Sequence, residues 1–198
     1  MQARKRGREF WLDLGVSLFW SLYAGGYLAR SLRQRQVVDV GLLVFYTLVA
    51  VAFLRRAPAR ANGPWWETAL ALVSVFLPIA VLRPAAGGLK GLGGVVQCVA
   101  LLGLVLALLS LGRSFAIAPS DRGLVTRGLY RWVRHPLYAS EICFYIGYLI
   151  ANPSGANLAG LLAGTALQIM RIRWEERLLA GYAAYAAKVR WRLFPLIW

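Results

Sequence analysis

Long apolar runs alternate with short polar segments along the 198-residue chain, a pattern typical of a membrane protein. A helix needs about 20 apolar residues to cross the hydrocarbon core of a bilayer. Four runs approach that length and two later runs are shorter: residues 10–29, 37–54, 65–82, 92–111, 137–151 and 158–170. The pattern therefore predicts an all-α integral membrane protein with about six transmembrane helices.

The last two apolar runs predict a short helical hairpin. The turn-rich sequence Asn-Pro-Ser-Gly-Ala-Asn at residues 152–157 separates them. Because a helix rises only about 1.5 Å per residue, each run is short for a full crossing. We expect the second helix of the hairpin to extend past the membrane edge into the cytoplasm, toward Lys188.

A polar segment, residues 112–136, divides the chain into two parts. We interpret residues 1–111 as an N-terminal transmembrane bundle of four spans. Residues 112–198 then contain the polar segment, the hairpin and a C-terminal tail. The tail alternates bulky and basic residues from position 190 onward, so we expect it to lie along the membrane interface.

Composition excludes two broad classes of protein. Hydrophobic residues make up 59% of the chain and charged residues only 16%, against about 25% charged residues in soluble domains. A soluble domain of this length has too little interior for that much apolar surface, and a disordered chain is far more polar.

The net charge is +15, but the basic residues lie between apolar runs. This distribution favours membrane flanks over a nucleic-acid surface.

The distribution of basic residues predicts an orientation in the membrane. Eighteen of the 23 Lys and Arg residues fall on one predicted side: the N-terminus, the second loop, the polar segment and the tail. The positive-inside rule places this side in the cytoplasm, so both termini are expected to be cytoplasmic. The high Arg, Ala and Gly content indicates a bacterial source, and hence a bacterial cytoplasmic membrane.

The sequence predicts no metal site. The two cysteines, Cys98 and Cys143, lie far apart inside apolar runs, and the chain has one histidine. This spacing fits neither a zinc site nor a disulfide framework, and we interpret both cysteines as small buried residues. Nothing in the sequence points to a particular oligomeric state.

The single histidine stands in the sequence Arg134-His135-Pro136 at the end of the polar segment. Proline restricts the preceding residue to extended conformations and favours the first position of a helix. Arg134 and His135 are therefore expected at a helix N-terminus, where free backbone N–H groups bind carboxylates or phosphates.

Two polar stripes continue from this point. Tyr138, Glu141, Tyr145 and Tyr148 follow helical spacing on the first helix of the hairpin. A carboxylate facing lipid is costly, so this stripe should face the bundle interior, either as a functional group or as a structural pair with an arginine. The second helix carries Gln168, Arg171, Glu175 and Tyr182 on one face, with Tyr185 beside it.

The adjacent acids Glu175 and Glu176 admit two interpretations. They lie among Arg171, Arg173 and Arg177, so local helix salt bridges would account for them. Together with Arg134 and His135 at the same membrane edge, they instead suit a zwitterionic ligand, with cations for its carboxylate and acids for its ammonium or hydroxyl groups.

These motifs carry a family resemblance. The run GLVTRGLYRWVRHPLY at residues 123–138, the Glu pair, the two tyrosines and RLFP at 192–195 resemble the isoprenylcysteine carboxyl methyltransferase family. The related phospholipid N-methyltransferases share the Arg-His-Pro and Glu-Glu elements. The resemblance covers about residues 110–195. Ser140 departs from it, because the family usually has glycine there, and this position is expected to line the cofactor or acceptor passage.

The resemblance implies an S-adenosylmethionine-dependent membrane methyltransferase that releases S-adenosylhomocysteine, with residues 112–198 as its cofactor-binding and catalytic region. Its lipophilic or prenylated acceptor enters from the lipid bilayer. It implies Arg171 as the group that orients an acceptor carboxylate, Glu141 as a base for an amine acceptor, and Glu175 as a third catalytic residue. The implied cofactor-binding residues are Gly123, Leu124, Val125, Gly128, Tyr130, Arg134, His135, Pro136, Tyr138, Glu175 and Glu176.

Two other functions stay open from the residues alone. A membrane reductase of the sterol or fatty-chain type would bind NADPH at the same basic face. A non-enzymatic scaffold or transporter would place polar residues near the membrane midplane and often in repeats, whereas here they gather at one edge. The acceptor itself is a carboxylate, an amine or a thiol.

Overall fold

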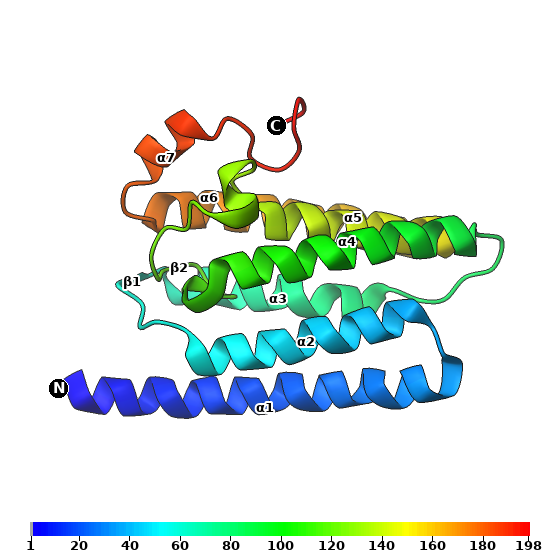
Figure 1. Ribbon diagram of the computed structural model, residues 1–198, viewed down its shortest axis with the longest axis horizontal. Helices are drawn as coiled ribbons and strands as arrows, with labels where there is room; N and C mark the ends of the chain where they lie inside the picture. The colour runs from blue at the N-terminus through cyan, green and yellow to red at the C-terminus, as the bar shows by residue number, and fades with distance from the viewer. Residues whose placement is uncertain (1) are drawn as a thin grey trace.

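Six long helices lie side by side and a seventh, short one caps one end of the bundle (Figure 1). The structure is a computed structural model that describes residues 2–198, with side chains from residue 9 onward. The basic side chains Arg4, Lys5, Arg6 and Arg8 used for the orientation lie outside the described side chains. The helices are α1 (Gln2–Gln34), α2 (Val37–Arg55), α3 (Trp65–Val81), α4 (Lys90–Leu111), α5 (Pro136–Ala151), α6 (Gly155–Leu178) and α7 (Tyr182–Lys188).

The helical fold class is confirmed, with one small addition. Strands β1 (Ala61–Asn62) and β2 (Ser120–Asp121) form a two-residue antiparallel ladder, and 3-10 turns η1 (Gly112–Ser114) and η2 (Gly128–Arg131) lie in the polar segment. Backbone bonds from Ala57 to Arg113 (2.7 Å) and from Gly63 to Pro119 (2.9 Å) extend the ladder. The loop between α2 and α3 is thus attached to the polar segment.

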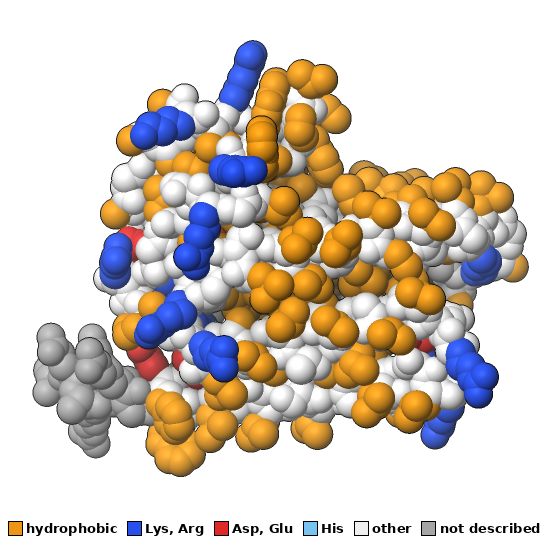
Figure 2. All heavy atoms as spheres, in the orientation of Figure 1, with side chains coloured by type: hydrophobic (Ala, Val, Ile, Leu, Met, Phe, Trp, Pro, Cys, Tyr) orange, Lys and Arg blue, Asp and Glu red, His pale blue; other side chains and the backbone are white. Residues whose placement is uncertain are grey.

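The apolar surface of the bundle agrees with a membrane environment. Figure 2 shows hydrophobic side chains over the middle of the bundle and Lys and Arg mainly toward its ends. Among the described residues, α2 and the helical stretch Lys90–Ser114 are long and apolar enough to cross a membrane. Helices α3 and α5 are apolar but shorter. The count of six crossings therefore stays a prediction.

The hairpin forms as expected, but its second helix ends earlier. Helices α5 and α6 are joined by residues 152–154, where the Ser154 hydroxyl accepts a bond from the Asn157 N–H (3.1 Å) and caps α6. The expected continuous helix toward Lys188 is wrong. Helix α6 stops at Leu178, and Gly181 adopts a left-handed conformation (φ 77°) that starts α7 in a new direction.

Helices α4 and α5 make the most extensive helix contact in the bundle, and small residues bring them together. A Cβ atom on Gly93 would lie 2.5 Å from the Gly147 carbonyl oxygen, and one on Gly103 would lie 2.5 Å from the Ser140 hydroxyl. Small residues permit such close approach between membrane helices. Ser140 therefore occupies this helix contact.

Replacing Gly93 with alanine should destabilise the α4–α5 contact, because its Cβ would press on the backbone of α5. Gly94 is the matched control, since no atom lies within 4 Å of its Cβ position. We expect Gly93→Ala to lower the free energy of unfolding by about 1–3 kcal/mol relative to Gly94→Ala. Thermal unfolding in detergent measures the difference, and equal stability of the two variants would contradict the packing.

Candidate functional site

A cleft lies at the end of the bundle that carries the β1–β2 ladder and α7. Five elements form its walls: the end of α4, the polar segment, the first turn of α5, the last turn of α6 and α7. The lining residues are Leu111, Ser114, Ala116, Ala118, Ser120, Gly123, Leu124, Val125, Tyr130, Arg134, His135, Leu137, Tyr138, Glu175, Leu179, Tyr182 and Tyr185.

The N-terminus of α5 opens into this cleft. His135 is the N-cap residue and Pro136 follows at the first helical position, as the sequence predicts. The tail holds this segment in place, because the Arg134 and His135 N–H groups donate to the Trp191 and Arg192 carbonyls (2.8 Å each). The first turn of α5 is thereby anchored by a backbone pairing between residues more than fifty positions apart.

Glu176 is the centre of a charged network beside the cleft. Its carboxylate meets His135 Nε2 (3.2 Å) and Arg192 Nε (3.0 Å), and the Tyr182 hydroxyl donates to it. Arg134 Nη1 lies 3.8 Å away. Burial alone would raise the pKa of Glu176, but the bonds from His135, Tyr182 and Arg192 outweigh it and lower the pKa to about 2. Glu176 is therefore an anion that holds α5, α6, α7 and the tail together.

Glu175 and Glu176, both predicted to bind the cofactor, have different environments. Glu175 lines the cleft and accepts a hydrogen bond from the Tyr138 hydroxyl. Glu176 is not among the lining residues. Neighbouring positions on a helix point about 100° apart, so the two acids face different surroundings.

Two of the three predicted catalytic residues, Arg171 and Glu141, are not among the lining residues either. The Arg171 guanidinium lies over the Tyr138 ring, 4.9 Å from its centroid, and Tyr138 itself lines the cleft. Arg171 is 5% exposed and donates to Ser74 Oγ (3.0 Å) and the Ile117 carbonyl (2.9 Å). Glu141 accepts a bond from the Tyr145 hydroxyl (3.3 Å). The structure therefore places Arg171 behind Tyr138 as seen from the cleft.

Of the two glycines predicted to bind the cofactor, one lines the cleft and the other does not. Gly123 lines the cleft with φ 102°, a conformation that favours glycine. Gly128 (φ 60°) is not a lining residue. It packs closely on Ser110, which leaves no space for a Cβ atom. Pro136 starts α5 without lining the cleft. Ser140, expected to line a passage, contacts Gly103 on α4 instead.

Residues 114–120 form one wall of the cleft, and sequence reasoning missed them. Four of them line it, namely Ser114, Ala116, Ala118 and Ser120. Their small side chains and irregular backbone carry no spacing signal. Tyr182 and Tyr185 also line the cleft, although the predicted site omitted them. Burial raises the pKa of Tyr185 to about 12, and its hydroxyl donates to the Tyr130 carbonyl (2.5 Å).

Among the described residues, no group of three or more His, Cys, Asp or Glu side chains could hold a metal ion.

Arg134 Nε and Arg171 Nε are buried N–H groups with no partner in the described part of the chain. Two unpaired cationic donors near one cleft favour an anionic group on whatever binds there.

Comparison with known proteins gives one family match and one similar solved structure. The family described as phospholipid methyltransferase matches residues 81–186, more than half of the chain and most of the cleft. A solved structure of the eukaryotic intramembrane Ras methyltransferase, isoprenylcysteine carboxyl methyltransferase without a monobody, is similar with a TM-score of 0.49 and 22% identity. That match covers 100% of this chain and 87% of the other. No curated protein matches the chain.

Acid should weaken the fold through Glu176. Its pKa is about 2 in the folded protein against an ordinary 4.5, so its ionised form stabilises the fold above pH 4.5, and this contribution is lost as the pH falls toward 2. We expect the unfolding temperature of Glu176→Gln to change less than that of the unmodified protein across this interval. The exposed acid Glu9 provides a control, since Glu9→Gln should retain the full pH dependence.

Proposed function

The chain belongs to the phospholipid methyltransferase family, and from this premise we propose that it is an S-adenosylmethionine-dependent membrane methyltransferase. We propose further that its acceptor is lipophilic and carries a carboxylate, as an isoprenylcysteine does. The observation that carries the proposal is the cleft where Arg134, His135, Tyr138 and Glu175 meet the N-terminus of α5.

The donor set of the cleft fits the cofactor. Arg134, with its buried unpartnered Nε, and the Leu137 and Tyr138 N–H groups in the first turn of α5 suit the carboxylate of the methionine part. Glu175 suits an ammonium group or ribose hydroxyls. Leu124, Val125 and other apolar lining residues suit the adenine ring. When bound, S-adenosylmethionine supplies an electrophilic methyl group.

The polar segment forms much of the cleft wall, and several elements hold it in place. The Ile117 carbonyl accepts a bond from Arg171 (2.9 Å), and the Tyr130 carbonyl accepts one from the Tyr185 hydroxyl (2.5 Å). The β1–β2 ladder joins Ser120 and Asp121 to the loop between α2 and α3. A cofactor held between these walls would be shielded from water, which strengthens electrostatic contacts inside the cleft.

The acceptor would approach through the bundle behind Tyr138. Arg171 carries an unpartnered Nε there, and its other donors are held by Ser74 and Ile117. A guanidinium fixed in this way can orient a carboxylate, and alignment of two reactants is a large part of catalysis. A carboxylate needs no base, whereas an amine acceptor would need one, and Glu141 on α5 is the candidate for that role.

The alternative function is not favoured. A membrane reductase would bind NADPH at this end of the bundle, but the matching family is one of methyltransferases.

Binding of S-adenosylhomocysteine to the detergent-purified protein tests the cofactor proposal. We expect measurable binding by calorimetry and no binding of NADPH. Glu175→Gln should weaken the affinity about tenfold or more, because a hydrogen bond to a charged group contributes roughly 1.5–3 kcal/mol. Arg33→Gln, at an exposed position on the opposite end of the bundle, should bind normally. Binding of NADPH without binding of S-adenosylhomocysteine would contradict the methyltransferase proposal and support the reductase.

The variant Arg171→Gln tests the proposed acceptor contact independently of cofactor binding. Since Arg171 does not line the cleft, the affinity for S-adenosylhomocysteine should stay within about twofold, a difference of roughly 0.4 kcal/mol. Methyl transfer to an S-alkylated N-acylcysteine should fall roughly 10- to 100-fold, the loss expected for a charged hydrogen bond to the acceptor. Normal transfer by this variant would contradict the assignment of Arg171.

A further inference from the structure

The tail folds back along the side of the bundle as a short hook, residues 193–198. Leu193 packs with Tyr138, Ala139 and Ile142 on the first two turns of α5, and Phe194 and Trp198 pack against the same cluster. The hook closes on itself, because the Arg192 and Leu193 N–H groups both donate to the Trp198 carbonyl (2.9 and 3.0 Å). Because α5 is one of the predicted transmembrane helices, we expect its first turns, and the hook packed on them, to lie at the membrane edge.

The tip of the hook is apolar and exposed. Leu196 and Ile197 are 86% and 79% exposed, among the highest values for large hydrophobic residues in the described chain. Leu196 has a positive φ of 70°, an uncommon conformation for a branched residue, which turns the chain at the tip. Trp132, which directly follows η2, is 63% exposed. Exposed apolar groups at this depth fit an interface between headgroups and acyl chains.

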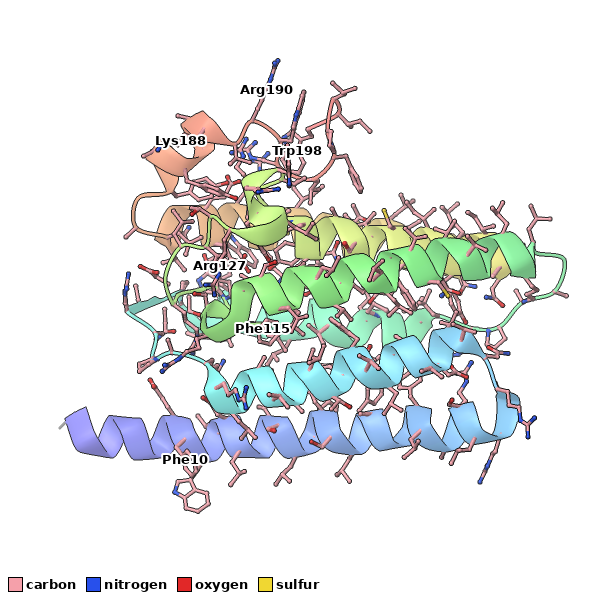
Figure 3. All side chains as sticks on the ribbon, viewed as in Figure 1. Phe10, Phe115, Arg127, Lys188, Arg190 and Trp198 are labelled. Atoms are coloured by element: carbon pink, nitrogen blue, oxygen red, sulfur yellow. The ribbon has the colours of Figure 1, made fainter. Side chains whose placement is uncertain are left out.

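Exposed basic side chains lie on η2, at the end of α7 and in the tail before the hook. These are Arg131, Lys188 and Arg190, and among residues 9–198 no acidic side chain lies within 4.0 Å of them. Arg131 lies over the Trp132 ring and Arg190 over the Trp191 ring, each 4.9 Å from the centroid. Figure 3 shows Lys188, Arg190 and Trp198 together on this cap. We refer to these basic residues, Trp132 and the hook as the C-terminal cap.

The C-terminal cap is connected directly to the cleft. The Trp191 and Arg192 carbonyls hold the Arg134 and His135 N–H groups, and Arg134 Nη2 donates to the Arg190 carbonyl (2.9 Å). The side chain of Arg192 pairs with Glu176. Any contact that orders residues 190–192 therefore also orders the residues at the N-terminus of α5.

We propose that the C-terminal cap binds anionic phospholipid of the surrounding membrane and that this contact orders the Arg134–His135 segment of the cleft. The charge of the cap selects an anionic headgroup, and its apolar tip enters the adjoining acyl region. Basic residues near a membrane surface are attracted to anionic lipid. Lipid contact and backbone order do not depend on the proposed function, whereas the effect on cofactor affinity rests on it.

Hydrogen exchange of the full chain in nanodiscs tests the proposal. One set of discs contains phosphatidylcholine alone, and the other contains equal parts of phosphatidylcholine and phosphatidylglycerol. In the anionic discs we expect slower exchange in residues 188–198, which reports lipid contact, and in residues 130–138, which reports the coupling. The affinity for S-adenosylhomocysteine should rise by up to about fivefold, the factor that corresponds to one basic contact with an anionic surface.

Matched variants make the test specific. The double variant Lys188→Gln/Arg190→Gln should lose both changes in exchange, although its backbone bonds to Arg134 stay available. The control Arg33→Gln/Arg35→Gln removes two exposed charges from the opposite end of the bundle and should keep both changes.

Four outcomes are distinguishable. Equal exchange in the two kinds of disc would overturn the proposal, and so would equal responses of the two double variants. Slower exchange in residues 188–198 alone would overturn the coupling. If both segments respond but S-adenosylhomocysteine binds in neither disc, the lipid proposal holds and the proposed function fails.

Discussion

The ion-pair network around Glu176 is the interaction on which the site depends. One carboxylate receives bonds from the N-cap of α5, from α7 and from the tail, while its own backbone belongs to α6. A partly buried anion is stable only when such partners compensate its lost hydration. Removing any one element would leave charge uncompensated, so the cleft and its cap form together. The low pKa of Glu176 is a consequence of the same bonds.

Helix α3 and the loop before it also contribute to the site. Ser74 on α3 and the Ile117 carbonyl hold Arg171, and the β1–β2 ladder ties the loop between α2 and α3 to a wall of the cleft. Glu67, which is fully buried on α3, pairs with Arg177 on α6 (2.5 Å). Polar side chains of a membrane bundle find partners inside it because lipid offers none. This constraint explains why residues near the cleft are joined to helices distant in sequence.

Local patterns in the sequence were sufficient for the helices and for part of the site. The apolar runs correspond to α1–α6, because a helix that crosses a bilayer needs a continuous apolar stretch. Arg134-His135-Pro136 starts α5, because proline restricts the residue before it and suits the first position of a helix. The face carrying Tyr138 and the face carrying Glu175 meet at the cleft, as the spacing of the two stripes indicates.

The sequence by itself determined the helical membrane class, the place of the Arg-His-Pro turn and the concentration of polar residues at one end. Only the tertiary structure decided which of two adjacent acids lines the cleft, that Tyr138 separates Arg171 from it, and that residues 114–120 form a wall. It also decided that Ser140 packs on Gly103 and that the tail pairs with the start of α5. The physical reason is range: hydropathy and proline act on neighbouring residues, whereas a wall or a pairing depends on contacts between distant segments.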